Sequence, residues 1–280
     1  MDNSQFFMTV KDYSVSHETF NLYHDQTLNL LYVHPQPRIE NLGKYYESDD
    51  YISHTDAARS LFEKLYQFIK GITLNRKLQL INSLQKNKGT LLDIGAGTGD
   101  FLSVSIKNGW RGIGTEPNKN AQSVAKKKGI SLIDDTDSIE RHSVDIITMW
   151  HVLEHIPDTQ KQIAELKRLL KPNGTILVAV PNFNSFDANY YKEFWAAFDV
   201  PRHLWHFSKS AIKILFEREQ LQLEKILPMP YDAFYVSLLS EKYKTGRMNF
   251  IRAIWVGLLS NLKGIRSQEF SSHIYVIRNT

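Results

Sequence analysis

The chain has 280 residues, of which 42% are hydrophobic and 23% are charged, and its formal net charge is +4. This composition is typical of a globular protein, and so small a charge, spread along the chain, does not indicate nucleic-acid binding. The absence of cysteine excludes disulfides and thiolate zinc sites, and the lack of a signal peptide or of an apolar run of about 18 residues predicts a cytoplasmic protein without a membrane span.

Residues 1–80 are expected to form an N-terminal hairpin and a helical cap. FNLYHD and LNLLYVH lie on either side of Gln26 and Thr27, which predicts a β-hairpin over residues 19–34. A helical pattern then extends from Thr55 to about Gln85.

From Thr90 onward, apolar runs alternate with amphipathic segments. Strands are expected within GTLLDIGAG, RGIGTEPN, ISLIDD, VDIITMW and TILVAVPN, and helices within DFLSVSIKNG, NKNAQSVAKKKG and DTQKQIAELKRLL, with KPNG as a turn before the fifth strand. This alternation predicts βαβ units and a doubly wound, α/β parallel sheet with helices on both faces. We expect residues 81–229 and 271–280 to form this core, with SSHIYVIRN as its last strand.

Residues 230–270 are expected to be a helical insertion, with two helices parted by KTGR, that caps the substrate or contacts another subunit. Its second part, residues 247–266, is apolar on most faces and carries flanking arginines and lysines. A basic amphipathic helix of this kind can lie on a membrane surface, hold a lipid tail or form a homodimer contact. It can equally pack against its neighbour YDAFYVSLLSEKY, because both segments carry apolar stripes.

Glycines follow the first strand of the core. LLDIGAGTGD places Gly95, Gly97 and Gly99 at the carboxyl end of this strand, where open parallel sheets bind their ligands. Alternating glycines let the backbone turn sharply and let a ligand approach. Glu116 ends the next strand, where an acid can accept both ribose hydroxyls of a nucleoside. Together these features predict a nucleoside cofactor.

Several motifs in order make the chain resemble a known family. LLDIGAGTGD, VDIITMWHVLEHIPD, LKRLLKPNGTILVAVPN and PRHLWHFS resemble segments of class I S-adenosylmethionine-dependent methyltransferases, in particular the ubiquinone-biosynthesis branch with a domain like methyltransferase domain 23. The resemblance covers about residues 88–228 and the last strand. It implies a Rossmann-like sheet with an antiparallel last strand. It also implies methyl transfer from S-adenosylmethionine to a small-molecule acceptor, such as an aromatic, quinone-like or lipid-linked hydroxyl.

The resemblance also implies roles for individual residues around the cofactor. Asp93 would hold the glycine loop and the amino group of the cofactor, and Glu116 would bind its ribose. Asp135 is the best match for the acid that meets the adenine amino group, although Asp134 and Asp137 lie in the same stretch. The remaining residues expected along the cofactor are Gly95, Ala96, Gly97, Gly99, Trp150 and His151.

Two other functions remain open at this point. A nicotinamide-dependent oxidoreductase would share the architecture, but its G-x-G-x-x-G pattern would need a glycine at Asp100. A non-catalytic adenosyl-binding protein that regulates a partner would bind the cofactor without turnover.

The segment HVLEH places His151, Glu154 and His155 one helical turn apart, on a single face. These side chains are expected to line the cofactor pocket and brace its loop, to ligate a divalent metal, or to include a general base. His203 or His206 could complete a metal site, but our favoured expectation is that no metal binds. His203 and His206 are the better placed bases, and His151 is a third catalytic candidate.

The acceptor is expected to contact segments outside the alternating pattern. The resemblance places tyrosines of GKYYESDDYISH over the cofactor, and Tyr46 and Tyr51 are the candidates. Trp195 and Arg202, in the aromatic-rich segment 183–207, are the other residues expected to contact the acceptor.

Overall fold

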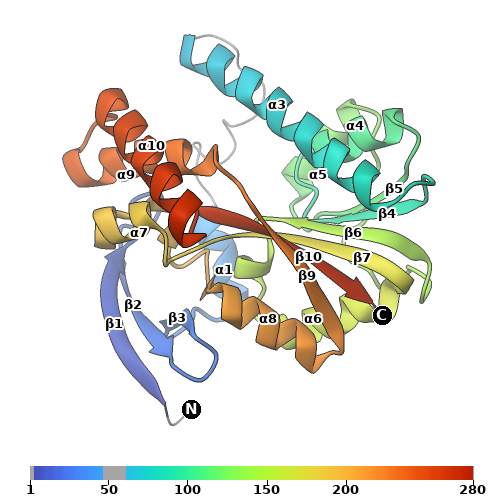
Figure 1. Ribbon diagram of the computed structural model, residues 1–280, viewed down its shortest axis with the longest axis horizontal. Helices are drawn as coiled ribbons and strands as arrows, with labels where there is room; N and C mark the ends of the chain where they lie inside the picture. Colours follow the sequence, from blue (N-terminus) through green and yellow to red (C-terminus); the bar gives the residue numbers. More distant parts are fainter. Residues whose placement is uncertain (1–2, 47–60, 280) are drawn as a thin grey trace.

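The computed structural model describes residues 3–46 and 61–279. Its centre is a sheet of six strands in the order β5 (Arg111–Thr115), β4 (Thr90–Ile94), β6 (Val144–Trp150), β7 (Leu170–Pro181), β10 (Ser272–Asn279) and β9 (Leu221–Pro228). The first four run parallel, whereas β10 pairs antiparallel with both β7 and β9 (Figure 1). The expected doubly wound α/β fold with an antiparallel last strand is therefore confirmed.

Helices cover both faces of this sheet. α3 (Leu61–Leu84), α4 (Asp100–Lys107) and α5 (Lys119–Lys127) lie on one side, and α6 (Thr159–Leu169) and α8 (Lys209–Arg218) on the other (Figure 1). Successive side chains of a strand point to opposite faces, so Leu91 joins the apolar cluster under α3 and α4, while Leu92 joins the cluster under α6 and α8. Burial on both faces explains why these strands read as continuous apolar runs.

Two expected details of the alternating region are wrong. ISLIDD forms no strand in the described structure and makes only a single parallel bridge, between Ile133 and Thr115. KPNG is not a turn but lies inside β7, where Asn173 adopts a left-handed φ of 62°. Because Leu170 already pairs with Val144, the strand begins before the apolar run that predicted it.

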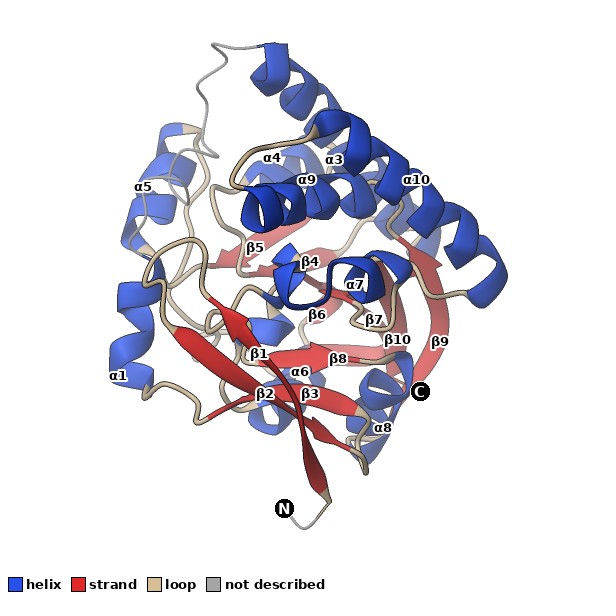
Figure 2. Ribbon diagram, turned by 90° about the vertical axis from the view of Figure 1, so that its left-hand side faces the viewer, coloured by secondary structure: helices blue, strands red, loops and turns tan. Residues whose placement is uncertain are grey.

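The N-terminal segment forms a second, antiparallel sheet in the order β1 (Ser4–Lys11), β2 (Thr19–Asp25), β3 (Leu30–His34) and β8 (Trp205–Phe207) (Figure 2). β2 and β3 are the expected hairpin, whereas β1 and β8 have no counterpart in the prediction. β8 belongs to the segment after β7, so this sheet is joined to the carboxyl end of the core. The short helices α1 (Ile39–Leu42) and η1 (Gly43–Tyr46) follow β3.

Two further segments complete the molecule. The aromatic stretch after β7 forms α7 (Phe186–Tyr191), η3 (Lys192–Phe194) and η4 (Ala196–Phe198). The insertion between β9 and β10 forms the two expected helices, α9 (Asp232–Thr245) and α10 (Phe250–Ser267), with Gly246 at a left-handed φ of 78° between them. Within the described ranges, no helix is long and apolar enough to cross a membrane.

Candidate active site

The glycine loop lies between β4 and α4, at the carboxyl end of the parallel strands. Gly95, Gly97 and Gly99 all adopt left-handed conformations, with φ values of 66°, 55° and 74°. A Cβ at Gly95 would lie 2.5 Å from a methyl carbon of Val152, so packing as well as conformation requires glycine there. A Cβ at Gly97 would meet nothing within 4 Å. The backbone at Gly97 is therefore open to a ligand, as the expected cofactor contact requires.

Glu116 fixes this loop from the end of β5. Its side chain is 9% exposed, and its two carboxylate oxygens accept hydrogen bonds from the backbone nitrogens of Gly97 and Asn118, each at 2.9 Å. Ala96 makes a further bond, from its backbone nitrogen to the carbonyl of Thr115 at 2.9 Å. Each carboxylate oxygen of Glu116 keeps a second lone pair, so the same side chain can also accept hydroxyl groups of a ligand.

Asp93 is buried under the loop, where Thr148 Oγ1 donates to its Oδ1 at 2.6 Å. Burial raises the pKa of Asp93, against the opposing effects of Thr148 and Lys77. Lys77 of α3 is the cation that acts on Asp93, and its Nζ lies 4.2 Å from the centroid of the Trp150 ring. Burial lowers the pKa of Lys77, although Asp93 and Asp232 favour its charged form. A carboxylate and an aromatic face that already accommodate one cation form a suitable site for a positively charged ligand.

His151 links the end of β6 to the helical insertion. It adopts a φ of 57°, and its Nδ1 lies 3.4 Å from Glu154 Oε1 while its Nε2 lies 3.2 Å from Asp232 Oδ2. Burial disfavours the imidazolium, but the two carboxylates outweigh this effect and raise the pKa of His151 to about 9. A histidine that already carries its proton at neutral pH is not suited to act as a general base.

Glu154, His155 and His203 form a second cluster beyond His151. They come from η2 (Leu153–His155) and from the loop before β8, and each offers a ligand atom within 4.8 Å of the others. Both oxygens of Glu154 are buried without a hydrogen-bond partner among the described residues. His151 is not a member of this group, so the alternative metal set of His151, Glu154 and His155 is not the one whose ligand atoms lie together.

The histidines of this cluster have defined partners on one ring nitrogen. Nδ1 of His203 lies 2.9 Å from the carbonyl of Ala197, and because a carbonyl only accepts, this nitrogen carries the proton and leaves Nε2 as an acceptor. Nδ1 of His155 lies 3.0 Å from both the carbonyl of Arg202 and the hydroxyl of Tyr46. Burial and the neighbouring His203 lower the pKa of His155 to about 4, so its ring is neutral. A carboxylate with two imidazoles can bind a proton or a cation, and this set of ligand atoms suits zinc, manganese or iron.

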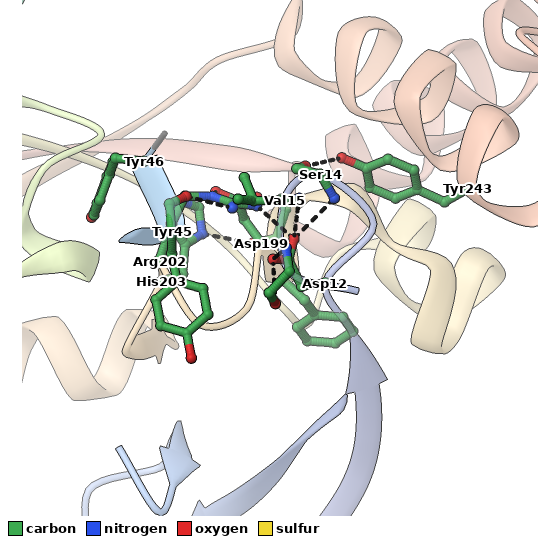
Figure 3. A network of polar contacts seen from close by, with 12 residues as sticks. Asp12, Ser14, Val15, Tyr45, Tyr46, Asp199, Arg202, His203 and Tyr243 are labelled. Carbon is green, nitrogen blue, oxygen red and sulfur yellow. Dashed lines mark hydrogen bonds and ion pairs between the residues drawn. The ribbon is translucent and has the colours of Figure 1, made fainter. Parts of the chain in front are cut away.

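Arg202 lies in a network of buried polar contacts (Figure 3), at a small pocket that Asp12 and Tyr243 also line. Its guanidinium donates to both oxygens of Asp199, to Asp12 Oδ1 at 3.3 Å and to the carbonyl of Tyr45 at 2.9 Å. Asp12 also accepts backbone hydrogen bonds at 2.9 and 2.7 Å from Ser14 and Ser16. These partners satisfy the guanidinium, so Arg202 joins the N-terminal sheet to the loop that carries His203.

Trp195 and His206 are also placed in the interior. Trp195 is 1% exposed, and its Nε1 donates to Asp187 Oδ2 at 2.8 Å. His206 bonds the carbonyl of Phe198 at 2.9 Å through Nε2, and burial lowers its pKa to about 4. Both side chains therefore stabilise the aromatic segment.

The remaining expected residues are less informative. Asp135 is exposed, and its Oδ1 accepts from the backbone nitrogen of Asp137 at 3.0 Å. Asp134 pairs with Lys119 at 2.5 Å, and the assignment of Asp135 to the adenine of the cofactor stays a prediction. Tyr51 lies outside the described residues.

Lys77 and Asp232 are contacts that the sequence did not predict. Both lie in segments expected only to cap the core, and neither belongs to a recognisable motif. Their only signal is position, since Lys77 lies on the helix before the glycine loop and Asp232 begins the first helix of the insertion.

Comparison with known proteins finds relatives over the segment that carries the glycine loop. A family model described as a methyltransferase domain matches residues 63–226, which is more than half of the chain. A ubiquinone biosynthesis O-methyltransferase of Photorhabdus laumondii is 31% identical over 134 residues, covering 44% of this chain and 54% of that protein. An uncharacterized protein of Methanocaldococcus jannaschii is 33% identical over 110 residues, covering 38% and 51%. The chain thus spans about half the length of these curated relatives.

Solved structures share the fold at low identity. The geranyl diphosphate C-methyltransferase of Streptomyces coelicolor, solved with Mg²⁺, geranyl diphosphate and S-adenosyl-L-homocysteine, superposes with a TM-score of 0.55 at 12% identity. The superposition covers 81% of this chain and 88% of that one. This likeness shows a common architecture.

Proposed function

The chain belongs to the methyltransferase-domain family of class I S-adenosylmethionine-dependent enzymes, and on that premise we propose that it methylates a hydroxyl group of a small aromatic, quinone-like or lipid-linked acceptor. Membership of this family argues against the nicotinamide-dependent alternative. The observation that carries the choice of a hydroxyl is the cluster of Glu154, His155 and His203, in which Nε2 of His203 can accept a proton beside the Glu154 carboxylate.

The residues around the glycine loop suit this cofactor. Glu116 would accept hydrogen bonds from the ribose hydroxyls of the cofactor. Asp93 would face the amino group of the cofactor, because a buried carboxylate gains most from a positively charged partner. Gly97 offers an open backbone, and Trp150 offers an aromatic face. When bound, S-adenosylmethionine supplies a methyl group that its sulfonium already activates.

The remaining work of the protein is to orient the acceptor and to remove its proton. We assign proton removal to His203, whose Nε2 is left as an acceptor by the bond from Nδ1 to Ala197. Glu154, beside it, would stabilise the imidazolium that forms, as it already does that of His151, whose Nδ1 lies 3.4 Å from Glu154 Oε1. Tyr46 holds His155 through its hydroxyl and lies at the edge of the same cluster. His151, already cationic, would contribute charge rather than basicity.

The relatives agree in part with this choice. The Photorhabdus protein is named an O-methyltransferase of ubiquinone biosynthesis, and oxygen acceptors need proton removal more than amines or activated carbons do. A non-catalytic adenosyl-binding role would give the cluster of Glu154, His155 and His203 no function.

The proposal is tested with S-adenosylmethionine carrying a labelled methyl group and a panel of acceptors. The panel should contain phenols and catechols with and without a prenyl chain, together with amines of similar size. We expect label in the phenolic compounds only. Transfer to amines alone would overturn the hydroxyl assignment, and cofactor binding without transfer to any acceptor would support the regulatory alternative.

A further inference from the structure

Helix α10 turns its large apolar side chains away from the protein. Its buried positions are small or slender: Ala253, Val256, Gly257, Ser260 and Gly264. A Cβ on Gly257 would lie 2.6 Å from the Phe234 ring, so the helix packs tightly on α9 through residues without bulk. The apolar stripe of α10, defined here as Phe250, Ile251, Ile254, Trp255, Leu258, Leu262 and Ile265, is between 42 and 85% exposed.

The stripe is continuous along the helix. Its members recur three and four residues apart, which places them on one face over the full length of α10. Figure 2 shows the helix on the outer edge of the molecule. Monomeric proteins rarely expose an apolar patch larger than a few hundred Å² unless it binds something. The packing expected between the two helices of the insertion does occur, but it leaves this face uncovered.

The charged residues in the sequence that carries the stripe are all positive. Between residues 242 and 267 the sequence has cations at Lys242, Lys244, Arg247, Arg252, Lys263 and Arg266, and no aspartate or glutamate. Arg252, Lys263 and Arg266 are exposed and border the stripe on one side. The ammonium group of Lys263 also lies 4.0 Å over the ring of Phe186 on α7. A binding partner with a complementary surface would therefore be apolar where it meets the stripe and anionic beside it.

We propose that α10 lies flat on the surface of an anionic lipid bilayer. The stripe would enter the boundary between headgroups and acyl chains, with the indole of Trp255 at the level of the headgroups. Arg252, Lys263 and Arg266 would face lipid phosphates, since juxtamembrane cations are attracted by the negative surface potential. This inference does not depend on which acceptor is methylated.

A second copy of the chain is a poorer occupant for the same face. A dimer of identical chains brings the same patch together from both sides. The cations of one copy would then face those of the other, and residues 242–267 contain no acid to compensate them. An anionic bilayer supplies the opposite charge instead.

The proposal is tested by co-sedimentation of the whole protein with two kinds of vesicle, phosphatidylcholine alone and phosphatidylcholine with an equal part of phosphatidylglycerol. We expect binding to the anionic vesicles only, and its loss at high salt. Ile254→Ser with Trp255→Ser should abolish binding, and Arg252→Gln with Lys263→Gln should weaken it roughly fivefold for each charge removed. The matched control is Ile39→Ser on α1, an apolar residue that is 73% exposed and should bind as the unchanged protein does.

Two further readouts distinguish the other occupants. Brominated lipid should quench the tryptophan fluorescence of the unchanged protein, and this quenching should be smaller in Trp255→Ser, because the indole of Trp255 is 60% exposed on the stripe. No binding to anionic vesicles, or equal binding by the double serine variant, would overturn the proposal. A dimer by light scattering that Trp255→Ser dissociates would assign the face to a second copy. Methyl transfer to a soluble acceptor should survive in Trp255→Ser, so failure of this inference is separable from failure of the proposed function.

Discussion

Asp232, the first residue of α9, holds the ring of His151 at the end of β6, with Oδ2 3.2 Å from Nε2. This contact joins the helical insertion to the candidate cofactor site. It also means that the insertion helps to set the charge at the carboxyl end of the sheet, because Asp232 and Glu154 together keep His151 protonated.

The first prediction concerns the pH dependence of stability. The pKa of His151 is raised from 6.5 to about 9, so its stabilising effect is complete below about pH 6.5 and is lost as the pH rises through 9. Asp232→Asn should lower the free energy of unfolding at pH 7 by roughly 1 kcal/mol, as expected for a partly exposed pair. It should also flatten the fall in stability between pH 7 and 9. Denaturant unfolding across this range measures both, with Glu140→Gln as the surface control.

The second prediction concerns Glu116. Its replacement by glutamine keeps the size of the side chain but removes the charge that can accept the ribose hydroxyls. Charge-assisted hydrogen bonds contribute about 1.5 to 3 kcal/mol, so the affinity for S-adenosylhomocysteine should fall roughly 10- to 150-fold. Titration calorimetry measures the loss. Asp134→Asn is the control, since Asp134 pairs with Lys119 on the surface, and an unchanged affinity in Glu116→Gln would remove Glu116 from the site.

The third prediction concerns Asp93, whose pKa is raised by burial. If its carboxylate faces the amino group of the cofactor, it must be ionised for the pairing to form. The affinity for S-adenosylhomocysteine should therefore increase as the pH rises from acid through neutrality, and Asp93→Asn should bind weakly at every pH. If the unchanged protein binds equally well at pH 5.5 and 8, and Asp93→Asn binds with the same affinity, the side chain of Asp93 does not contact the cofactor.

The fourth prediction separates proton removal from metal binding. His203→Gln should lower kcat by about 100- to 10,000-fold while sparing cofactor affinity, because general bases contribute on that scale. His206→Asn, which loses only an interior contact, is expected to affect stability more than turnover. Turnover should also survive dialysis against a chelator. Loss of activity on chelation, with one transition metal per chain by elemental analysis and none in His155→Ala, would assign Glu154, His155 and His203 to an ion.

The parts of the site that sequence could predict are local. Asp93, the glycines and Glu116 lie on consecutive strand ends, so the alternation of strands and helices fixes both their order and their common edge. Lys77 and Asp232 reach this edge from helices outside that alternation, and no local pattern says where such a helix will dock. The contacts of Lys77 with Trp150 and of Asp232 with His151 can be recognised only once the positions of α3 and α9 are known.

The residues expected to contact the acceptor could not be placed in the same way. Trp195 and Arg202 are the residue types that bind aromatic or anionic ligands, but the structure gives both of them internal partners. Arg202 finds Asp12, which lies at the end of a strand that the sequence pattern did not reveal. The composition of segment 183–207 predicted contacts with a ligand. Composition alone cannot distinguish a side chain that binds a ligand from one that forms a buried ion pair or hydrogen bond.

The assignment of the glycine loop to S-adenosylmethionine is tested most directly by thermal unfolding with S-adenosylhomocysteine and, in parallel, with NAD. A ligand at about one hundred times its dissociation constant adds roughly 2.7 kcal/mol of stability. For a chain of this size that corresponds to a rise of several degrees in Tm, at about 2 to 4 °C per kcal/mol. We predict such a rise with S-adenosylhomocysteine and none with NAD, and a much smaller rise in Glu116→Gln. A rise with NAD alone would contradict the assignment of the glycine loop and, with it, the proposed methyl transfer.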